Sequence, residues 1–240
     1  MSFDVHCHIL PKVDDGAKDE GSTKRMLEIA DAEGIDVIVA TPHFQCGERQ
    51  MPVEELKNRF ASVRSWWEEY GEEKKLYLGN ELFYSESLVD ALEHGEALTM
   101  NGTSYVLVEF PIYVDYMYIL KGIQRLRYAG YIPIVAHIER YDCLQNRKRV
   151  QELVQAGAYM QVNTSTIMGG HGYFAHRYVM NLFKYRLLHF VGTDAHDSKG
   201  RKPEMEKCAA YLEKKIGPTK AHRILVENPE KMLRGEELYG

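Results

Sequence analysis

The stretch from His6 to Gly16, HCHILPKVDDG, contains two histidines one residue apart and two adjacent aspartates before a glycine. It begins inside a β-rich run that predicts a strand over residues 3–8. Because successive side chains of a strand point to opposite faces, His6 and His8 share one face and Cys7 lies on the other. The histidines therefore belong either to a site at the end of the strand or to a strand that contains them incidentally.

Strand-like runs recur along the chain with helical segments between them. Six further strands are predicted at residues 36–41, 76–81, 105–109, 132–137, 159–163 and 188–194. Helices are expected between Ser22 and Gly34 and at residues 53–70, 85–94, 116–129, 147–156, 174–185 and 203–215, with a helical tail over 219–238. This alternation predicts an α/β protein with parallel strands, either an open doubly wound sheet or a closed barrel.

The composition excludes several classes of protein. The chain has 240 residues, 45% hydrophobic and 27% charged, and we expect one folded domain over residues 1–240. A formal charge of -5 with mixed signs provides no basic stripe, so no nucleic-acid partner is expected. Since neither a secretory signal nor a membrane-spanning run is present, we expect a cytoplasmic protein. The four scattered cysteines form no CxxC pair and predict reduced thiols.

Histidines or acidic residues end six of the seven predicted strands. In parallel barrels, side chains at the carboxyl ends of the strands converge on one site. Clustered imidazoles and carboxylates would repel one another and lose solvation unless cations compensated them, so the pattern predicts a metal site. Imidazole and carboxylate ligands without thiolate favour manganese, zinc or iron. The candidate ligands are His6, His8, His43, Glu81, Glu109, His137, Asp194 and His196.

The number of candidate ligands predicts more than one ion. A catalytic zinc takes three protein ligands, so eight or nine ligands imply two or three ions with at least one bridging carboxylate. Asp14 and Asp15 follow the first strand in a loop tightened by Gly16. One of them could complete the cluster while the other caps the next helix, or both could be turn residues.

Six short motifs, in this order, resemble a known family. They are HCHILPKVDDG, ATPHF (40–44), GNELFY (79–84), VEFP (108–111), AHIERY (136–141) and TDAH (193–196). Together, from residue 3 to about residue 201, they resemble the polymerase and histidinol phosphatase (PHP) superfamily. Within it they are most similar to the bacterial manganese-dependent tyrosine-protein phosphatases of capsule and exopolysaccharide loci, the CpsB/CapC/YwqE type. Each motif alone is weak, whereas the combination is specific.

The resemblance implies a fold and a set of ligands. The fold would be a distorted seven-stranded, TIM-like (β/α) barrel, the PHP fold, with three divalent ions, usually manganese. One ion would be bound by His6, His8, Glu81 and Asp194, and a second by Glu81, Glu109 and His137. The third would be bound by Asp15, His43 and His196, which leaves Asp14 as a turn residue. Arg140, three residues after His137, and Arg201, five after His196, occupy the positions of the family's two arginines.

The resemblance also implies hydrolysis of phosphotyrosine by direct attack of metal-bound hydroxide, with Arg140 and Arg201 binding the phosphate. The expected partner is an autophosphorylated bacterial tyrosine kinase, through its C-terminal tyrosine cluster, in control of capsule or exopolysaccharide synthesis. Two alternatives are a small-molecule phosphomonoesterase such as histidinol-phosphate phosphatase and an inactive metal-binding regulatory module. Cys143 and Arg149 match the cysteine-x5-arginine spacing of thiol-based tyrosine phosphatases, but no glycine lies between them, so we interpret this spacing as chance.

Overall fold

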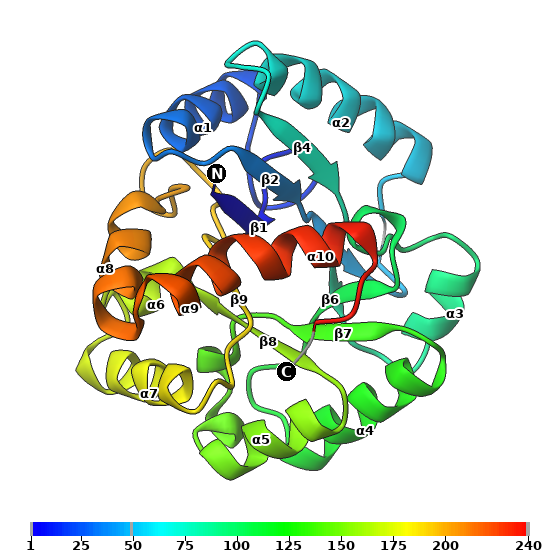
Figure 1. Cartoon of the computed structure of the whole chain (residues 1–240). Helices are drawn as coiled ribbons and strands as arrows, with labels where there is room; N and C mark the ends of the chain where they lie inside the picture. The colour runs from blue at the N-terminus through cyan, green and yellow to red at the C-terminus, as the bar shows by residue number, and fades with distance from the viewer. Residues whose placement is uncertain (1, 49, 239–240) are drawn as a thin grey trace.

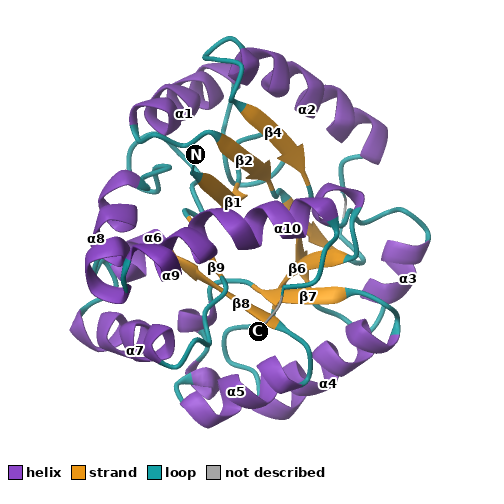
Figure 2. Ribbon diagram, in the orientation of Figure 1, coloured by secondary structure: helices purple, strands orange, loops and turns teal. Residues whose placement is uncertain are grey.

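The computed structural model describes residues 2–48 and 50–238. Nine parallel strand segments occupy the centre of the described chain, and helices surround them (Figure 2). The strands are β1 (Phe3–Cys7), β2 (Val37–Ala40), β3 (His43–Gln45), β4 (Lys75–Leu78), β5 (Glu81–Phe83), β6 (Tyr105–Glu109), β7 (Ile132–Val135), β8 (Tyr159–Asn163) and β9 (Phe190–Gly192). The helices are α1 (Glu20–Ala32), α2 (Val53–Glu68), α3 (Leu88–Glu93), α4 (Tyr116–Tyr128), α5 (Arg147–Gln155), α6 (Thr164–Ile167), α7 (Tyr173–Lys184), α8 (Glu206–Ile216), α9 (Pro218–His222) and α10 (Asn228–Arg234).

The strands form a ring, as expected for a barrel. Hydrogen bonding joins β1, β2 and β4 in one sheet and β3, β5, β6, β7, β8 and β9 in a second. The ring closes where β1 meets the residues after β9: the amide of His8 donates to the Ala195 carbonyl and that of Asp194 to the His6 carbonyl, both at 2.8 Å. Histidine and aspartate pairs far apart in sequence therefore become neighbours.

Two of the seven predicted strands are each broken into two segments, which the sequence pattern did not indicate. Pro42 lacks an N–H and interrupts the second strand, so that it continues as β3 from His43. The third strand breaks at Gly79 and Asn80, where the side-chain amide of Asn80 donates to the Pro42 carbonyl at 2.8 Å. Parallel pairing then resumes with His43 opposite Glu81. The two breaks thus bring an imidazole and a carboxylate side by side.

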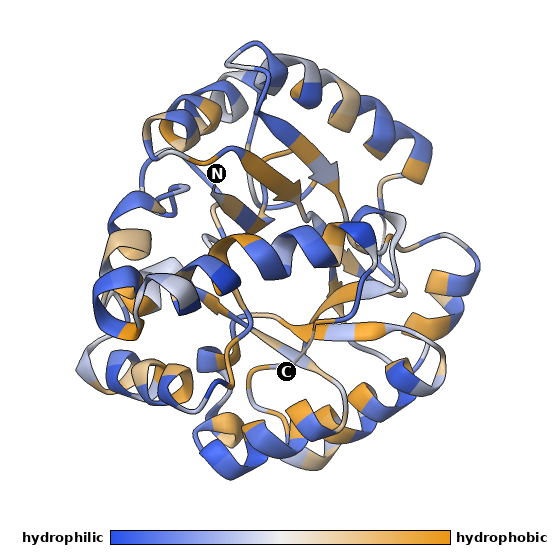
Figure 3. Cartoon of the chain, viewed as in Figure 1, coloured by the Kyte–Doolittle hydropathy of each residue, from blue (hydrophilic) through white to orange (hydrophobic). Residues whose placement is uncertain are grey.

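The interior of the ring is apolar at one end and polar at the other. Phe3, Val5, Tyr105 and their neighbours pack together and against Met232 and Leu233 of α10, which crosses the middle of the ring in Figure 1. Along β1 the pairing with β2 shifts between Asp4 and Cys7, a bulge that adds one residue to β1. A second, larger core fills the space between strands and outer helices, whose exposed faces are hydrophilic in Figure 3.

The helices match their predicted positions with small shifts at the ends. The first helix begins at Glu20 rather than near Ser22, because Asp19 is the residue that caps it by accepting from the Ser22 amide at 2.7 Å. A π-helical segment (Arg223–Glu227) joins α9 to α10. No helix among the described residues is long and apolar enough to cross a membrane.

Candidate metal centre

The nine candidate ligands lie in one cluster at the carboxyl ends of the strands. A carboxyl-end position is what a parallel barrel provides for a site. Most of the cluster is buried, with His6 fully inaccessible and Glu81 only 1% exposed, whereas the Asp15 side chain is 68% exposed at its rim. The cluster is therefore buried at its centre and open to solvent at the rim where Asp15 lies.

The first group surrounds His6 and His8, whose ring nitrogens Nε2 lie 3.2 Å apart. Oε2 of Glu81 lies 3.1 Å from His6 Nε2 and 3.2 Å from His8 Nε2. Oδ1 of Asp194 lies 3.5 and 3.6 Å from the same two nitrogens. These four residues can each offer one donor atom, all within 4.8 Å of one another, as a divalent cation requires.

The second group shares Glu81 with the first. Its other oxygen, Oε1, accepts a hydrogen bond from His137 Nε2 at 2.7 Å. Glu109 lies 3.5 Å from His137 Nε2 through Oε2 and 3.5 Å from His43 Nδ1 through Oε1. His43 Nδ1 is also 3.1 Å from Glu81 Oε2. Glu81 thus lies between two possible ion positions.

The third group is at the more exposed side. Asp15 Oδ1 lies 3.4 Å from His43 Nε2 and 3.3 Å from His196 Nε2. His8 completes this group of four possible donors. The structure thus brings the nine residues together, and it places His8 and His43 within reach of more than one group.

Several observations on the cluster fit divalent cations. Oε2 of Glu81 is buried and has no hydrogen-bond partner among the described residues, although imidazole nitrogens of His6, His8 and His43 lie 3.1–3.2 Å from it. Within the described part of the chain, the buried Nε2 of His196 also has no hydrogen-bond partner. Burial, together with the nearby His8 and Arg201, lowers the pKa of His196 to about 4, which keeps its imidazole neutral and able to bind a metal. The residues present therefore fit metal ions.

Asp14 is more than the turn residue predicted from the sequence. Its Oδ2 accepts from His8 Nδ1 at 2.7 Å and from the His43 amide at 3.0 Å, and its Oδ1 accepts from the Gly16 amide at 3.0 Å. Burial alone would lower the pKa of His8, but its hydrogen bonds with Asp14 and Glu81 outweigh burial and raise that pKa to about 10. A carboxylate that binds the outer nitrogen of a metal-binding imidazole fixes the orientation of the ring.

Two polar residues of β8 also position candidate ligands, although neither was predicted as a site residue from the sequence. Gln161 Oε1 accepts from the His137 amide at 2.7 Å and lies 3.3 Å from His6 Nδ1. Asn163 Nδ2 donates to Asp194 Oδ2 at 2.8 Å. The sequence pattern that could have indicated them is their spacing of two residues in an otherwise apolar strand, because this spacing places both side chains on the same, inward face.

The backbone is unusual at two candidate ligands. His137 has φ 31° and Asp194 has φ 54°, values in the left-handed region that residues with a side chain seldom adopt. Each lies two residues beyond the last residue of a strand, β7 and β9 respectively. Strained conformations of this kind collect at functional sites, where the surrounding structure compensates for them.

Arg140 and Arg201, the two arginines selected from the sequence, lie beside the cluster. Nη2 of Arg140 is 2.5 Å from Asp194 Oδ2, and Nη2 of Arg201 is 2.7 Å from Asp194 Oδ1. Both side chains are partly exposed, and they line a cavity of about 590 Å³ together with Asn163, Asp194 and His171. Two guanidinium groups thus face the opening next to the ligands.

The cysteine-x5-arginine stretch does not form a phosphate-binding loop. Arg149 donates to the Cys143 carbonyl at 2.9 Å and lies over the ring of Tyr116. Burial raises the pKa of the Cys143 thiol, which is the opposite of what a nucleophilic thiolate needs.

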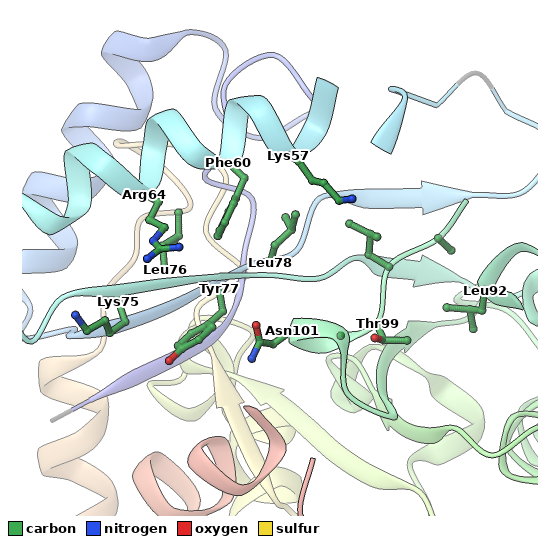
Figure 4. Close-up of a pocket in the computed structure, with 13 residues that line it drawn as sticks. Lys57, Phe60, Arg64, Lys75, Leu76, Tyr77, Leu78, Leu92, Thr99 and Asn101 are labelled. Carbon is green, nitrogen blue, oxygen red and sulfur yellow. The ribbon is translucent and has the colours of Figure 1, made fainter. Parts of the chain in front are cut away.

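Another cavity, of about 490 Å³, lies away from the cluster (Figure 4). Lys57, Phe60 and Arg64 of α2 lie opposite Leu76 and Leu78 of β4, whereas the Tyr77 ring points to the other side of the strand. None of its lining residues is a candidate ligand or either of the two arginines.

A closed ring of parallel strands with buried imidazoles and carboxylates at its carboxyl end defines a barrel protein with a candidate metal centre. The chain belongs to the family described as capsular polysaccharide synthesis, CpsB/CapC, whose model matches residues 2–234.

Known proteins similar to the chain agree with this assignment. The tyrosine-protein phosphatase CpsB of Streptococcus pneumoniae is 33% identical over 237 residues, which cover 96% of this chain and 98% of CpsB. A crystal structure described for YwqE from Bacillus subtilis and CpsB from Streptococcus pneumoniae, "unique metal-dependent tyrosine phosphatases", superposes with a TM-score of 0.90 at 30% identity and covers 99% of this chain and 96% of that one. The putative histidinol phosphatase HisK of Listeria monocytogenes shares the fold, with a TM-score of 0.53 at 10% identity over 83% of this chain and 97% of that one.

Proposed function

We propose that the chain is a metal-dependent protein-tyrosine phosphatase. The observation that carries this proposal is the convergence of five imidazoles and four carboxylates beside Arg140 and Arg201, in a chain whose similar proteins are named tyrosine-protein phosphatases. A phosphate dianion needs positive charge at its binding site, which the arginines and bound cations would supply together.

His6, His8, Glu81 and Asp194 would hold one divalent ion, Glu81, Glu109 and His137 a second, and Asp15, His43 and His196 a third. We propose three Mn²⁺ ions, with iron or zinc as the alternatives that the ligand types allow. When bound, such ions lower the pKa of a coordinated water and neutralise charge on phosphoryl oxygens.

The protein's own residues would orient these groups and the substrate. Gln161 accepts from His6 Nδ1 and thereby directs Nε2 of that ring toward Glu81, as Asp14 does for His8. Arg140 and Arg201 present forked donors that match phosphoryl oxygens and offset charge that develops on them in the transition state. We propose direct displacement by water, with no phosphoenzyme.

Exposed hydrophobic side chains near the carboxyl ends of the strands favour a protein substrate over a small metabolite. Tyr113, after β6, is 90% exposed, and Phe174, in the first turn of α7, is 85% exposed. Contiguous exposed apolar groups mark surfaces that contact other molecules, and the Phe174 ring contacts that of Tyr173, which is 66% exposed. We propose that the substrate is the tyrosine-rich C-terminal tail of an autophosphorylated bacterial kinase that controls capsule or exopolysaccharide synthesis.

A reconstitution assay tests the proposal. The purified protein is stripped with a chelator, reloaded separately with Mn²⁺, Fe²⁺ or Zn²⁺, and assayed with a phosphotyrosyl peptide, a phosphoseryl peptide and histidinol phosphate. We expect activity to disappear on stripping, to return with metal and to be highest with phosphotyrosine. Preference for histidinol phosphate would contradict the proposed substrate.

Cys143→Ser provides the control for mechanism. We expect this variant to keep wild-type activity, because Cys143 lies outside the cluster. A dead Cys143→Ser variant together with chelator-resistant wild-type activity would indicate a thiol mechanism instead. Single turnover in isotopically labelled water should place one solvent oxygen in the phosphate, whereas trapping of a covalent phosphoprotein would contradict direct displacement.

A further inference from the structure

His171 lies in the cavity beside the proposed catalytic centre, but neither the ligand set nor the phosphate-binding arginines include it. It belongs to the loop between α6 and α7, which follows the carboxyl end of β8. Its side chain lines the same cavity as Arg140, Asp194 and Arg201. An imidazole at this place faces the space that a phosphorylated tyrosine would enter.

A chain of two hydrogen bonds that starts at buried Glu139 determines which nitrogen of the His171 ring carries a hydrogen. Thr166 is fully buried, and its hydroxyl donates to Glu139 Oε1 at 2.9 Å. Since this hydroxyl has a single hydrogen, it must accept in its contact with His171 Nδ1, which is 2.9 Å away. Nδ1 therefore carries a hydrogen, and Nε2 is the atom that gains and loses a proton.

Glu139 is held firmly at the buried end of this chain. Its Oε1 also accepts from the Asn163 amide at 3.0 Å, and its backbone follows His137 and precedes Arg140. The turn that carries one candidate ligand and one arginine thus also sets the position of His171. A residue oriented through two buried polar groups is better placed for chemistry than a surface histidine of a free loop.

We propose that His171 is the general acid that protonates the leaving tyrosine oxygen. This inference rests on the proposed phosphatase function. The bond between phosphorus and the phenolic oxygen breaks, with its electron pair moving to that oxygen, while the oxygen of a water molecule forms the new bond to phosphorus. His171 Nε2 gives its proton to the phenolic oxygen. The proton that the water loses passes to solvent, and solvent reprotonates the imidazole, so no proton is consumed overall.

The chemistry of the substrate explains why such an acid is needed. Tyrosine has a pKa of about 10, so its phenolate is a poor leaving group at neutral pH. A positioned general acid typically contributes about 10²- to 10⁴-fold to such a step. An aryl phosphate with a much more acidic phenol, such as p-nitrophenyl phosphate, needs little of this help.

Charged groups of both signs share the cavity with His171, and they also contribute to the pH dependence of the activity. The loop from Met168 to Gly172 brings no other charged side chain. The charged residues that line the cavity are Glu33, Arg140, Asp194, Arg201, Lys202, Glu204 and Lys207.

His171→Gln tests the inference in the metal-loaded enzyme. We expect at least an approximately 100-fold loss of kcat with a phosphotyrosyl peptide and little change with p-nitrophenyl phosphate. Wild-type activity toward the peptide should fall on the alkaline side of its pH profile as the acid loses its proton, and this fall should disappear in the variant. Metal content and the unfolding midpoint should equal those of the wild type.

Two further variants separate catalysis from loop structure. His176→Gln is the matched control, because His176 lies five residues further on, in α7, and contacts the Ile167 carbonyl and the Tyr211 hydroxyl instead. It should leave both substrates unaffected. Thr166→Val removes the hydroxyl that orients His171. It should lower kcat for the phosphotyrosyl peptide but not for p-nitrophenyl phosphate, and by less than His171→Gln does.

The outcomes that oppose the inference are distinct from those that oppose the proposed function. If His171→Gln slows both substrates equally, or neither, His171 is not the general acid. If the metal-loaded wild type hydrolyses neither substrate, the proposed phosphatase function is wrong, and the inference with it.

Discussion

Replacing Asp14 with asparagine should weaken metal binding, although Asp14 is not among the candidate ligands. Its Oδ2 accepts from His8 Nδ1 and from the His43 amide, and its Oδ1 accepts from the Gly16 amide. Asparagine offers one oxygen, so its NH2 group must face either the Gly16 N–H or the His43 N–H. In either orientation an N–H donor faces another N–H donor, and the repulsion between them displaces the loop that holds His8.

The size of the effect follows from these contacts. Loss of the partner that orients a metal-binding imidazole typically costs 10- to 100-fold in metal affinity, or about 1.4–2.8 kcal/mol. A backbone donor left without an acceptor costs roughly a further 1–3 kcal/mol in the free energy of unfolding. Water replaces the lost contacts poorly, because the Asp14 side chain is only 7% exposed.

Competition against a chromophoric chelator measures the Mn²⁺ affinity of Asp14→Asn, and thermal unfolding with and without metal measures its stability. Asp19→Asn is the matched control, because Asp19 also accepts from a backbone amide but contacts no imidazole, and asparagine caps helices as well as aspartate does. We expect the control to bind metal like the wild type. An unchanged affinity in Asp14→Asn would refute the idea that Asp14 orients His8.

Four further variants test other parts of the structure. Burial lowers the pKa of His189 from 6.5 to about 4, so the folded state disfavours its protonation; the resulting stability is fully present above pH 6.5 and is lost as the pH falls toward 4, by up to about 3 kcal/mol. His189→Gln should flatten this part of the stability profile of the metal-free protein, and an unchanged slope would contradict it. A Cβ at Gly192 would lie 2.6 Å from His6 Cβ, so Gly192→Ala should lower metal affinity at least about 10-fold, whereas Gly21→Ala, on an exposed helix face, should not. Arg140→Lys and Arg201→Lys should each lower kcat/KM about 10- to 100-fold at unchanged metal content, because lysine cannot bind phosphate bidentately; equal activity in either variant would remove that arginine from the site.

The cluster could be predicted from sequence because strand ends are fixed by short-range patterns. Alternation along a strand places His6 and His8 on one face, and parallel topology brings the ends of distant strands to one place. The general pattern and the family resemblance together select all nine residues that the structure brings together. The ring of strands and its outer helices follow from the same alternation of periods.

Other features depend on interactions that no local pattern shows. Asp14 has the appearance of a turn residue, and only the folded loop places its carboxylate against His8 Nδ1. The breaks at Pro42 and Gly79 are visible as residues, but their consequence, the pairing of β3 with β5, depends on strands that are about 40 residues apart. Contacts of this kind decide the orientation of the ligands rather than their identity.

Of the seven strands predicted from the sequence, β8 is the one that ends without a candidate ligand, and it connects the parts of the site. Gln161 contacts His6 and the backbone of His137, which belong to two different groups of ligands. The Asn163 side chain contacts Asp194, while its amide reaches Glu139 and, through Thr166, the chain that ends at His171. One rigid strand positions both the ligands and the proposed acid. A substitution at Asn163 should therefore change metal affinity and, at the same time, slow hydrolysis of the phosphotyrosyl peptide more than hydrolysis of p-nitrophenyl phosphate. Of the ligand-bearing strands, β7 also reaches the proposed acid, because Glu139 lies in the turn that follows it and contacts Thr166.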